Sequence, residues 1–332
     1  MLKLCSEILI EESPHKAESQ GRVWEFTSVA DCKIVEDTDT LTDTCELQLP
    51  KNIQWQEAVI KNGKPPIHRG DKVTVKLGYD GELTTRFVGY VRSVDAKAPV
   101  TIKCEDSMFI LKLKKAEPKS WKKASLKEVL QHLLKDTAID FQLIDNDLEL
   151  GSYRIVKETI SEELQELKEK YMLSSYFRMV GEKNVLYVGL KYPFDNRKKH
   201  VFRHGKNIVS EDLEYRNKDD IRARVQAESI GAKHKKTTIE IGDKDGDLIK
   251  IRIDGLSESE LKKYAEKTLE NYKKDGFKGS FETFGTPEVS KCDMVEIHAS
   301  DGNSGVYLVK KNEIEFGMKG YRQKIELGNA VN

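Results

Sequence analysis

The two histidines with the spacing of a metal site are His200 and His204, in the segment HVFRH. Residues four apart share a face only on an α-helix, where both imidazoles could reach one zinc ion. The intervening Val201 and Phe202 are typical of a strand instead, and the sequence marks no further ligands and no hydrogen-bond partners for them. We therefore expect no metal at this pair.

Three aspartates at alternate positions, Asp243, Asp245 and Asp247, resemble the start of a calcium-binding loop. Such a loop needs glycine at its sixth position and glutamate at its twelfth. Here Gly246 comes two positions early and position twelve is Asp254. We interpret the segment GDKDGD as a turn between two strands.

No other pattern selects residues for catalysis. The sequence has no G-x-S-x-G elbow, no G-K-[ST] phosphate loop and no H-E-x-x-H motif. Its 56 acidic residues leave room for a pair of hydrolytic carboxylates, but nothing marks any two of them. The tripeptide at 69–71, RGD, is interpreted as a turn before a strand and not as an adhesion motif. We expect no catalytic, cofactor-binding or metal residue, no cofactor and no enzyme activity.

The overall charge disfavours a nucleic-acid reader, because 56 basic and 56 acidic residues cancel. Lysine-rich runs near 112–123 and 197–206 lack interleaved exposed aromatics, so we interpret them as solvated surface. No apolar run has the length of a signal peptide or a membrane span, which predicts folding in the cytoplasm. The five cysteines are far apart, without a C-x-x-C pair, and we expect reduced thiols.

The first part of the chain alternates like half-buried strands. The segment 71–77, DKVTVKL, places Val73, Val75 and Leu77 on one face. Asp80-Gly81 then provides a two-residue turn that tolerates positive φ, and 84–94, TTRFVGYVRSV, returns as the partner strand. We predict an antiparallel β-barrel over residues 1–114.

Helical patterns begin after residue 115. Ser125 and Glu128 form a capping box at the start of SLKEVLQHLL, and Thr159 and Glu162 repeat the arrangement before EELQELKEKY. Two strand-like runs, YFRMV and NVLYVGL, follow. We predict an inserted α+β domain over residues 115–205.

Strands return from residue 206, around one long helix. Ser257 and Glu260 form a capping box for that helix. The runs TTIEIG and LIKIRI flank GDKDGD, which we interpret as a hairpin with an Asp245-Gly246 turn. We predict a second β-barrel over residues 206–332. The expected fold class is thus β-rich α+β, with two related antiparallel β-barrels flanking an inserted α+β domain.

The end of the chain echoes its beginning, since CDMVEIHASDGNSGVYLVKKNEI resembles GDKVTVKLGYDGELTTRFVGYVRSV. The matched residues are Asp71 with Asp293, Val73 with Val295, Val75 with Ile297, Asp80-Gly81 with Asp301-Gly302, and Phe87 with Tyr307. A chain that carries one β-module twice offers two equivalent faces, so a cyclic trimer would form a ring of six similar positions. The alternative is that the two segments are unrelated and are alike only because a strand, an Asp-Gly turn and a second strand are a common hairpin pattern.

These segments resemble the late-control protein D family, the baseplate hubs of contractile phage tails, and the related hub part of type VI secretion spike proteins. The resemblance rests on short motifs in the same order: Gly70-Asp71-x-Val73-x-Val75-x-Leu77, Phe87-Val88-Gly89-Tyr90-Val91, Glu105-Asp106, SLKEVLQHLL, SEELQELKEKY, YFRMVGEKNVLYVGL, Pro287, Asp293, Tyr307-x-Val309 and QKIELG. The chain departs from the family at Cys292, where glycine is usual, and at Glu313-Ile314-Glu315, where many members carry a histidine.

The resemblance implies a structural hub that joins the tail tube to the trimeric spike as a threefold-to-sixfold symmetry adapter. The implied partners are further copies in a homotrimer, the tail spike protein, the tail tube and other baseplate proteins. It implies no membrane insertion and no specific nucleic-acid binding, although DNA could pass through the lumen. The implied location is the virion baseplate, after assembly in the host cytoplasm. The alternatives are a tail-associated cell-wall hydrolase and the hub of a non-phage contractile injection system.

Overall fold

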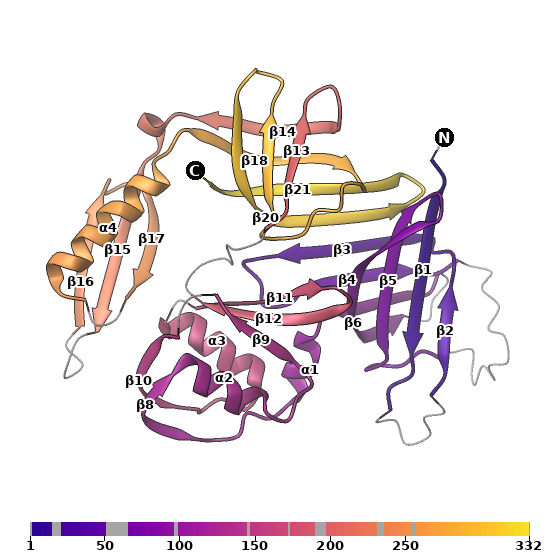
Figure 1. Cartoon of the computed structure of the whole chain (residues 1–332), viewed down its shortest axis with the longest axis horizontal. Coiled ribbons are helices and arrows are strands. Elements are labelled where there is room, and N and C mark those ends of the chain that lie inside the picture. The colour runs from indigo at the N-terminus through magenta and orange to yellow at the C-terminus, as the bar shows by residue number, and fades with distance from the viewer. Residues whose placement is uncertain are drawn as a thin grey trace.

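The computed structural model describes residues 2–14, 21–50, 66–95, 99–144, 147–171, 173–189, 197–230, 236–253 and 256–331. Strands dominate these residues, and the helices gather in two places (Figure 1). The β-rich α+β character predicted from the sequence is confirmed. None of the described helices has the length and hydropathy required to cross a membrane.

The first part of the chain is an antiparallel sheet with strand order β3-β4-β7-β6-β5-β1-β2. Its strands are β1 (Leu4–Glu11), β2 (Val23–Phe26), β3 (Asp31–Asp37), β4 (Thr44–Gln48), β5 (Lys72–Tyr79), β6 (Glu82–Asp95) and β7 (Thr101–Glu105). The predicted turn is confirmed, because Asp80 and Gly81 both have positive φ between the paired residues Tyr79 and Glu82. Alternate side chains of these strands form one buried apolar core.

A second core lies under the helices that follow. The elements here are α1 (Met108–Leu113), β8 (Ser120–Ser125), α2 (Leu126–Leu134), β9 (Asp140–Leu143), β10 (Glu149–Arg154), α3 (Ile160–Tyr171), β11 (Ser174–Val180) and β12 (Lys183–Gly189). The capping box of Ser125 and Glu128 is present at the start of α2. Thr159 and Glu162 exchange hydrogen bonds of 3.0 and 3.3 Å at the start of α3. The buried faces of the helices and of β11 and β12 share this core.

The last part of the chain forms a third core. Its strands are β13 (Lys199–Arg203), β14 (Ile208–Arg216), β18 (Gly276–Phe284), β19 (Met294–His298), β20 (Ser304–Gly317) and β21 (Gly320–Ala330). The order β14-β18-β21-β20 is antiparallel throughout, while β19 pairs with β20 and, in parallel, with β13. Aromatic side chains such as Phe202 and Phe281 fill the core at a ring separation of 4.9 Å.

A small separate sheet stands at one side of the molecule (Figure 1). It consists of β15 (Ala223–Ile230), β16 (Lys236–Gly242) and β17 (Asp247–Arg252), preceded by the short 3-10 helix η2 (Lys218–Asp220) and covered by α4 (Glu258–Tyr272). The capping box of Ser257 and Glu260 is present at the start of α4.

The predicted hairpin between β16 and β17 is wrong. Both strands pair with β15, which lies between them, and β17 runs parallel to it. The turn passes under the start of β15, where Asp243 Oδ2 accepts a hydrogen bond of 3.1 Å from the Ala223 amide. This arrangement places the isoleucines of both strands against the small apolar core under α4, with Val225 and Ala227 at its centre.

Candidate functional site: a buried charged seam

The first and last parts of the chain are joined into one sheet by strand pairing. β3 pairs antiparallel with β20, with Ile34 opposite Ile314 and Glu36 opposite Asn312. Figure 1 shows β20 beside β3, and β21 lies on the other side of β20. Phe316 and Tyr321 also enter the first core, so strands from the end of the chain complete the core that its beginning starts.

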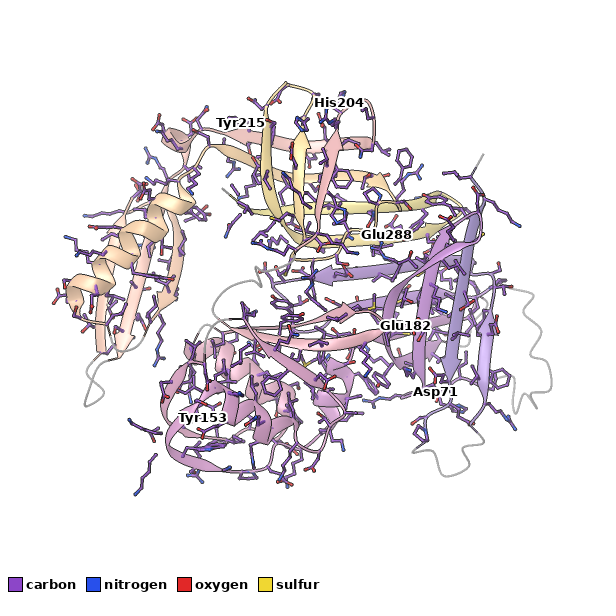
Figure 2. All side chains as sticks on the ribbon, viewed as in Figure 1. Asp71, Tyr153, Glu182, His204, Tyr215 and Glu288 are labelled. Carbon is purple, nitrogen blue, oxygen red and sulfur yellow. The ribbon has the colours of Figure 1, made fainter. Side chains whose placement is uncertain are left out.

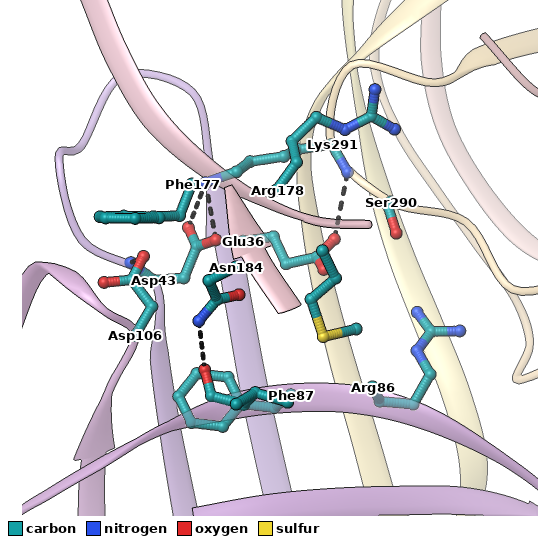
Figure 3. A pocket seen from close by; sticks show the side chains of 12 residues that line it. Glu36, Asp43, Arg86, Phe87, Asp106, Phe177, Arg178, Asn184, Ser290 and Lys291 are labelled. Atoms are coloured by element: carbon teal, nitrogen blue, oxygen red, sulfur yellow. Dashed lines mark hydrogen bonds and ion pairs between the residues drawn. The ribbon is translucent and has the colours of Figure 1, made fainter. Parts of the chain in front are cut away.

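We call the pairing of β3 with β20 the seam. Charged side chains are buried beside it, where the first, helical and last parts of the chain meet (Figure 3). They surround a cavity of about 30 Å³. The lining residues come from the first sheet, from β11 and β12, and from the segment before β19: Glu36, Asp43, Arg86, Phe87, Val88, Asp106, Phe177, Arg178, Met179, Asn184, Ser290 and Lys291. A space of this size accommodates about one water molecule and no substrate.

Lys291 is the centre of this cluster. Its ammonium lies 2.6 Å from Asp43 Oδ2, and its backbone amide donates to Glu36 Oε2 at 3.1 Å. Its side chain is only 2% exposed, so the ammonium depends on these carboxylates for compensation. Burial acts to lower the pKa of Lys291, but Asp43, Asp106 and Glu36 outweigh it and leave that pKa above its ordinary value.

The carboxyl groups of the cluster bind protons more tightly than usual. Burial raises the pKa of Glu36 to about 7, against the opposing charge of Arg86. Burial and the charge of Asp43 raise the pKa of Asp106 to about 7 as well. The pKa of Asp43 is also raised by burial, in spite of Lys291. These carboxyl groups therefore hold their protons to a higher pH than exposed carboxyl groups do.

Asp43 and Asp106 also fix the backbone around the cluster. The Asp43 amide donates to Asp106 Oδ2 at 3.0 Å, and the Asp106 amide donates to the Asp43 carbonyl at 3.0 Å. Asp106 Oδ1 accepts from the Met108 amide at 2.9 Å. These bonds tie the start of β4 to the entry of α1, and so connect the seam to the helical part.

A second buried network crosses the seam through Gln323. Its Oε1 accepts from Arg86 Nη2 at 3.1 Å and from the Val289 amide at 3.0 Å. Its Nε2 donates to the carbonyls of Phe284 and Pro287 at 2.9 and 2.8 Å. One side chain thus holds β6, β21 and the loop before β19 together.

Two contacts dock the helical part onto the seam. Asn184 Nδ2 of β12 donates to the Val88 carbonyl at 2.7 Å and to Ser107 Oγ at 2.9 Å. Arg178 Nη2 of β11 lies 2.8 Å from Asp293 Oδ1. The cluster can therefore lock three parts of one chain in a fixed arrangement.

The residues with metal-like spacing do not converge. His200 lies on β13 and contacts Asp293 at 3.2 Å, while His204 lies beyond that strand and contacts Glu211 at 3.4 Å. Among the described residues, no group of three or more histidine, cysteine or acidic side chains has the arrangement of a metal site. Asp243 instead pairs with Lys273 at 2.5 Å, and Asp254 lies outside the described residues.

The echo between the two ends of the sequence is a repeat of one hydrogen-bonding scheme. Asp71 Oδ2 accepts from the amide three residues earlier at 2.7 Å, and Asp293 Oδ2 does the same at 3.0 Å. The carbonyls of these aspartates accept from the amides of Val91 and Val309 at 2.8 and 2.9 Å. The two hairpins β5–β6 and β19–β20 are therefore built alike.

One pair in the sequence match is displaced by two residues. Tyr307 lies opposite Val295, as Gly89 lies opposite Val73, so Tyr307 corresponds to Gly89 and not to Phe87. A Cβ at Gly89 would lie 2.7 Å from the Phe87 ring, and one at Gly305 would lie 2.5 Å from the Tyr307 hydroxyl. The aromatic ring and the glycine that it covers have exchanged places between the repeats.

The sequence did not predict that the buried charged residues beside the seam form one site. Asp106 was noted through the family resemblance alone, and Lys291 was not singled out. No local signal marks Glu36 and Asp43 as buried, because both lie in the acidic, threonine-rich run 36–44, EDTDTLTDT, which is typical of exposed chain.

The sequence matches no family model and no curated protein. Solved structures match it over nearly its whole length. A tail protein from Neisseria meningitidis MC58 has a TM-score of 0.65 at 14% identity, covering 99% of this chain and 97% of that one. The 43 kDa tail protein of prophage MuSo2 from Shewanella oneidensis has a TM-score of 0.61 at 14% identity, covering 98% of both chains.

A third similar structure comes from a secretion system. It is an E. coli component of the type VI secretion system, described as structurally similar to the bacteriophage T4 tail proteins gp27 and gp5. Its TM-score is 0.58 at 8% identity, over 98% of this chain and 77% of that one. The chain therefore has the fold of phage tail proteins and of this type VI secretion component, which confirms at the level of the fold the resemblance inferred from its motifs.

Proposed function

We propose that this chain is the hub of a contractile-tail baseplate, which joins the tail tube to the trimeric spike as a threefold-to-sixfold symmetry adapter. The observation that carries the proposal is the repeated hydrogen-bonding scheme of β5–β6 and β19–β20 within one chain. The fold shared with phage tail proteins supports a structural role in a virion. The small volume of the cavity at the seam, about 30 Å³, supports a locking role over an enzymatic one.

In this proposal residues 1–114 and 206–332 are two tube domains, and residues 115–205 are the inserted domain between them. Three chains would place six similar modules around one axis, which matches a sixfold tube on one side and a threefold spike on the other. The seam would hold the two modules of each chain at a fixed angle. A closed ring requires such a constant angle between its modules. The lumen of such a ring could hold DNA without reading its sequence.

Light scattering tests the stoichiometry. The chain is co-expressed with the spike protein of its own genetic element and the complex is purified. We expect three copies of this chain for each spike trimer. A stable complex with two or six copies would refute the symmetry-adapter role, even with the fold unchanged.

The hydrolase alternative is tested with purified peptidoglycan, with lysozyme as the positive control. We expect no release of soluble fragments by this chain. Reproducible release that disappears on replacing one acidic residue would replace the structural proposal with an enzymatic one. The type VI neighbour leaves a non-phage injection system as a second setting for the same role, and the neighbouring genes distinguish the two.

A further inference from the structure

The repeat extends beyond the two hairpins into the sheet around them. β6 pairs with β7 from Val91 to Asp95 with a register shift after Val91, and β20 pairs with β21 with a register shift after Val309. Beyond the shift, Ser93 lies opposite Lys103 as Lys311 lies opposite Glu326. β6 thus corresponds to β20, and β7 corresponds to β21, residue by residue.

The correspondence continues to the outer strands. β4 lies beside β7 as β18 lies beside β21, and β3 lies beside β4 as β14 lies beside β18. Following the registers outward, Cys32 corresponds to Glu211, and Asp37 corresponds to Arg216. β14 is therefore the counterpart of β3.

These two counterparts differ in what lies on their outer edge. β3 is paired there with β20, which buries the apolar side chains beside it. β14 ends the sheet, and among the described residues its pairing partner is β18 alone. Its inward side chains, Leu213 and Tyr215, are only partly buried; Tyr215 is labelled at the top of Figure 2.

The segment that would receive β14 is the counterpart of the one that receives β3. Lys311–Gly317 of β20 holds β3 on the side opposite β21. The corresponding part of β6 starts at Ser93. At Ser93 and Val94, β7 occupies one side and no described strand occupies the other. One chain thus carries an internal junction and both halves of a second one.

We propose that β14 of one copy pairs antiparallel with β6 of the next copy at Ser93 and Val94, with Arg216 opposite Ser93 and Tyr215 opposite Val94. The register is that of Asp37 with Lys311 and Glu36 with Asn312 inside the chain. The occupant of the free edge of β14 is thus a second copy of this chain. The inference rests on the proposed function only for the number of copies in the ring.

The side chains fit a junction between copies. In the internal junction the polar pair Glu36 and Asn312 lies in the buried cluster. The corresponding pair between copies, Tyr215 and Val94, is largely apolar and can be buried without a counter-ion. Open strand edges attract other strands, and a head-to-tail contact that closes into a ring satisfies both edges without further aggregation.

Engineered disulfides test the register. In the internal junction the Thr38 amide donates to the Lys310 carbonyl at 3.1 Å, which makes Asp37 and Lys311 a non-hydrogen-bonded pair. Cα atoms of such pairs lie about 4.5 Å apart, within reach of a disulfide. The test variant therefore carries Ser93→Cys and Arg216→Cys, and the matched control carries Asp37→Cys and Lys311→Cys. Both include Cys5→Ser, because Cys5 is the one partly exposed native cysteine.

Full-length protein is oxidised alone and in complex with the spike, then separated on non-reducing gels. We expect the control to close within one chain and the test variant to link different chains. A displaced pair, Ser93→Cys with Glu214→Cys, should link at least about tenfold less, since its Cα atoms are out of reach. Cross-linking traps short-lived encounters, so weak association still gives a product.

The outcomes separate this inference from the proposed function. Linked chains from the test variant, with the displaced pair unlinked, support the junction whatever the number of chains. No linked chains while the control closes, or equal linking by the displaced pair, overturns it. Linked products that stop at three chains agree with the proposed hub, whereas a closed product of another size retains the junction and contradicts the symmetry adapter.

Discussion

Gly70 and Cys292 occupy the same backbone position in the two repeated hairpins. Both have positive φ, 92° and 67°, and their amides donate to the carbonyls of Val91 and Val309 at 2.8 and 2.9 Å. Left-handed backbone is strained for a residue with a Cβ. At Cys292 the second hairpin therefore takes with strain the conformation that the first hairpin takes without strain at Gly70.

Gly70→Ala should lower the free energy of unfolding by about 1–2 kcal/mol, because the added Cβ strains the left-handed backbone. The site has room for it, since the nearest atom is Ser13 Oγ at 4.0 Å. Denaturant titration measures the change. Cys292→Gly is the control: relief of the same strain offsets the lost packing of the thiol, so the loss should be absent. Equal stability of Gly70→Ala and the parent would contradict the strain.

Stability should fall as pH rises from about 5 to 7. The pKa of Glu36 is about 7 in the folded chain and 4.5 ordinarily, and the pKa of Asp106 is raised to about 7 from 3.8. The folded state thus holds protons that the unfolded state has released, which stabilises it at low pH and not above the folded pKa. Denaturant titrations across this range measure the slope. Glu36→Gln should flatten it, and an unchanged slope in that variant would contradict the assignment.

Lys291→Met should cost about 3–5 kcal/mol at neutral pH, since it leaves buried carboxylates without their cation. The loss should shrink at pH 5, where Glu36 and Asp106, each with a pKa of about 7, are protonated. Lys33→Met is the matched control: Lys33 pairs with Glu313 at 3.0 Å, but its side chain is 43% exposed. Exposed pairs contribute about 0–1 kcal/mol. Similar losses at both positions would show that Lys291 is not isolated from solvent.

Gln323→Ala should destabilise the seam by about 3 kcal/mol, because it leaves buried donors and carbonyls unpaired on three elements. Thermal unfolding should show the loss, and hydrogen exchange should rise first in β21 and at Val289. Gln165→Ala on α3 is the control, since its hydrogen bond to Glu169 is at the surface. A loss below that of the control would remove Gln323 from the seam.

Ser257→Ala should loosen α4 and leave the large sheet unaffected. It removes an N-cap that accepts from the Glu260 amide, worth about 1 kcal/mol. Hydrogen exchange should accelerate in α4 and β15. Lys262→Ala, at an exposed position of the same helix, should not change it. Acceleration spread equally over β3 and β20 would mean that the small sheet is not an independent unit.

The local features of the fold were predictable from the sequence. Asp80-Gly81 dictates a two-residue turn because both residues take positive φ, and Ser125 and Ser257 start helices because each caps an amide three residues later. The β16–β17 hairpin failed for the opposite reason. Nothing within GDKDGD shows that β15 comes between the flanking strands, since that depends on which apolar faces α4 covers.

The seam could not be read from local pattern. Lys291 stands in the sequence like any surface lysine, and its partner Asp43 lies 248 residues away. Only the pairing of β3 with β20 brings them together and excludes water. The sequence repeat correctly matched the hairpins β5–β6 and β19–β20, but it did not show which strands join the two ends of the chain.

The pairing of β3 with β20 also sets a time order on folding. Lys33 and Glu315 are 282 residues apart, so during synthesis this seam cannot form until nearly the whole chain has been made. A nascent chain that ends before β20 lacks Ile314, Phe316 and Tyr321 and leaves its first apolar core open. Contacts of such long range are slow to form. Prematurely terminated chains would thus expose apolar, protease-sensitive surface. Cellular proteases would then degrade them before they could enter an assembly.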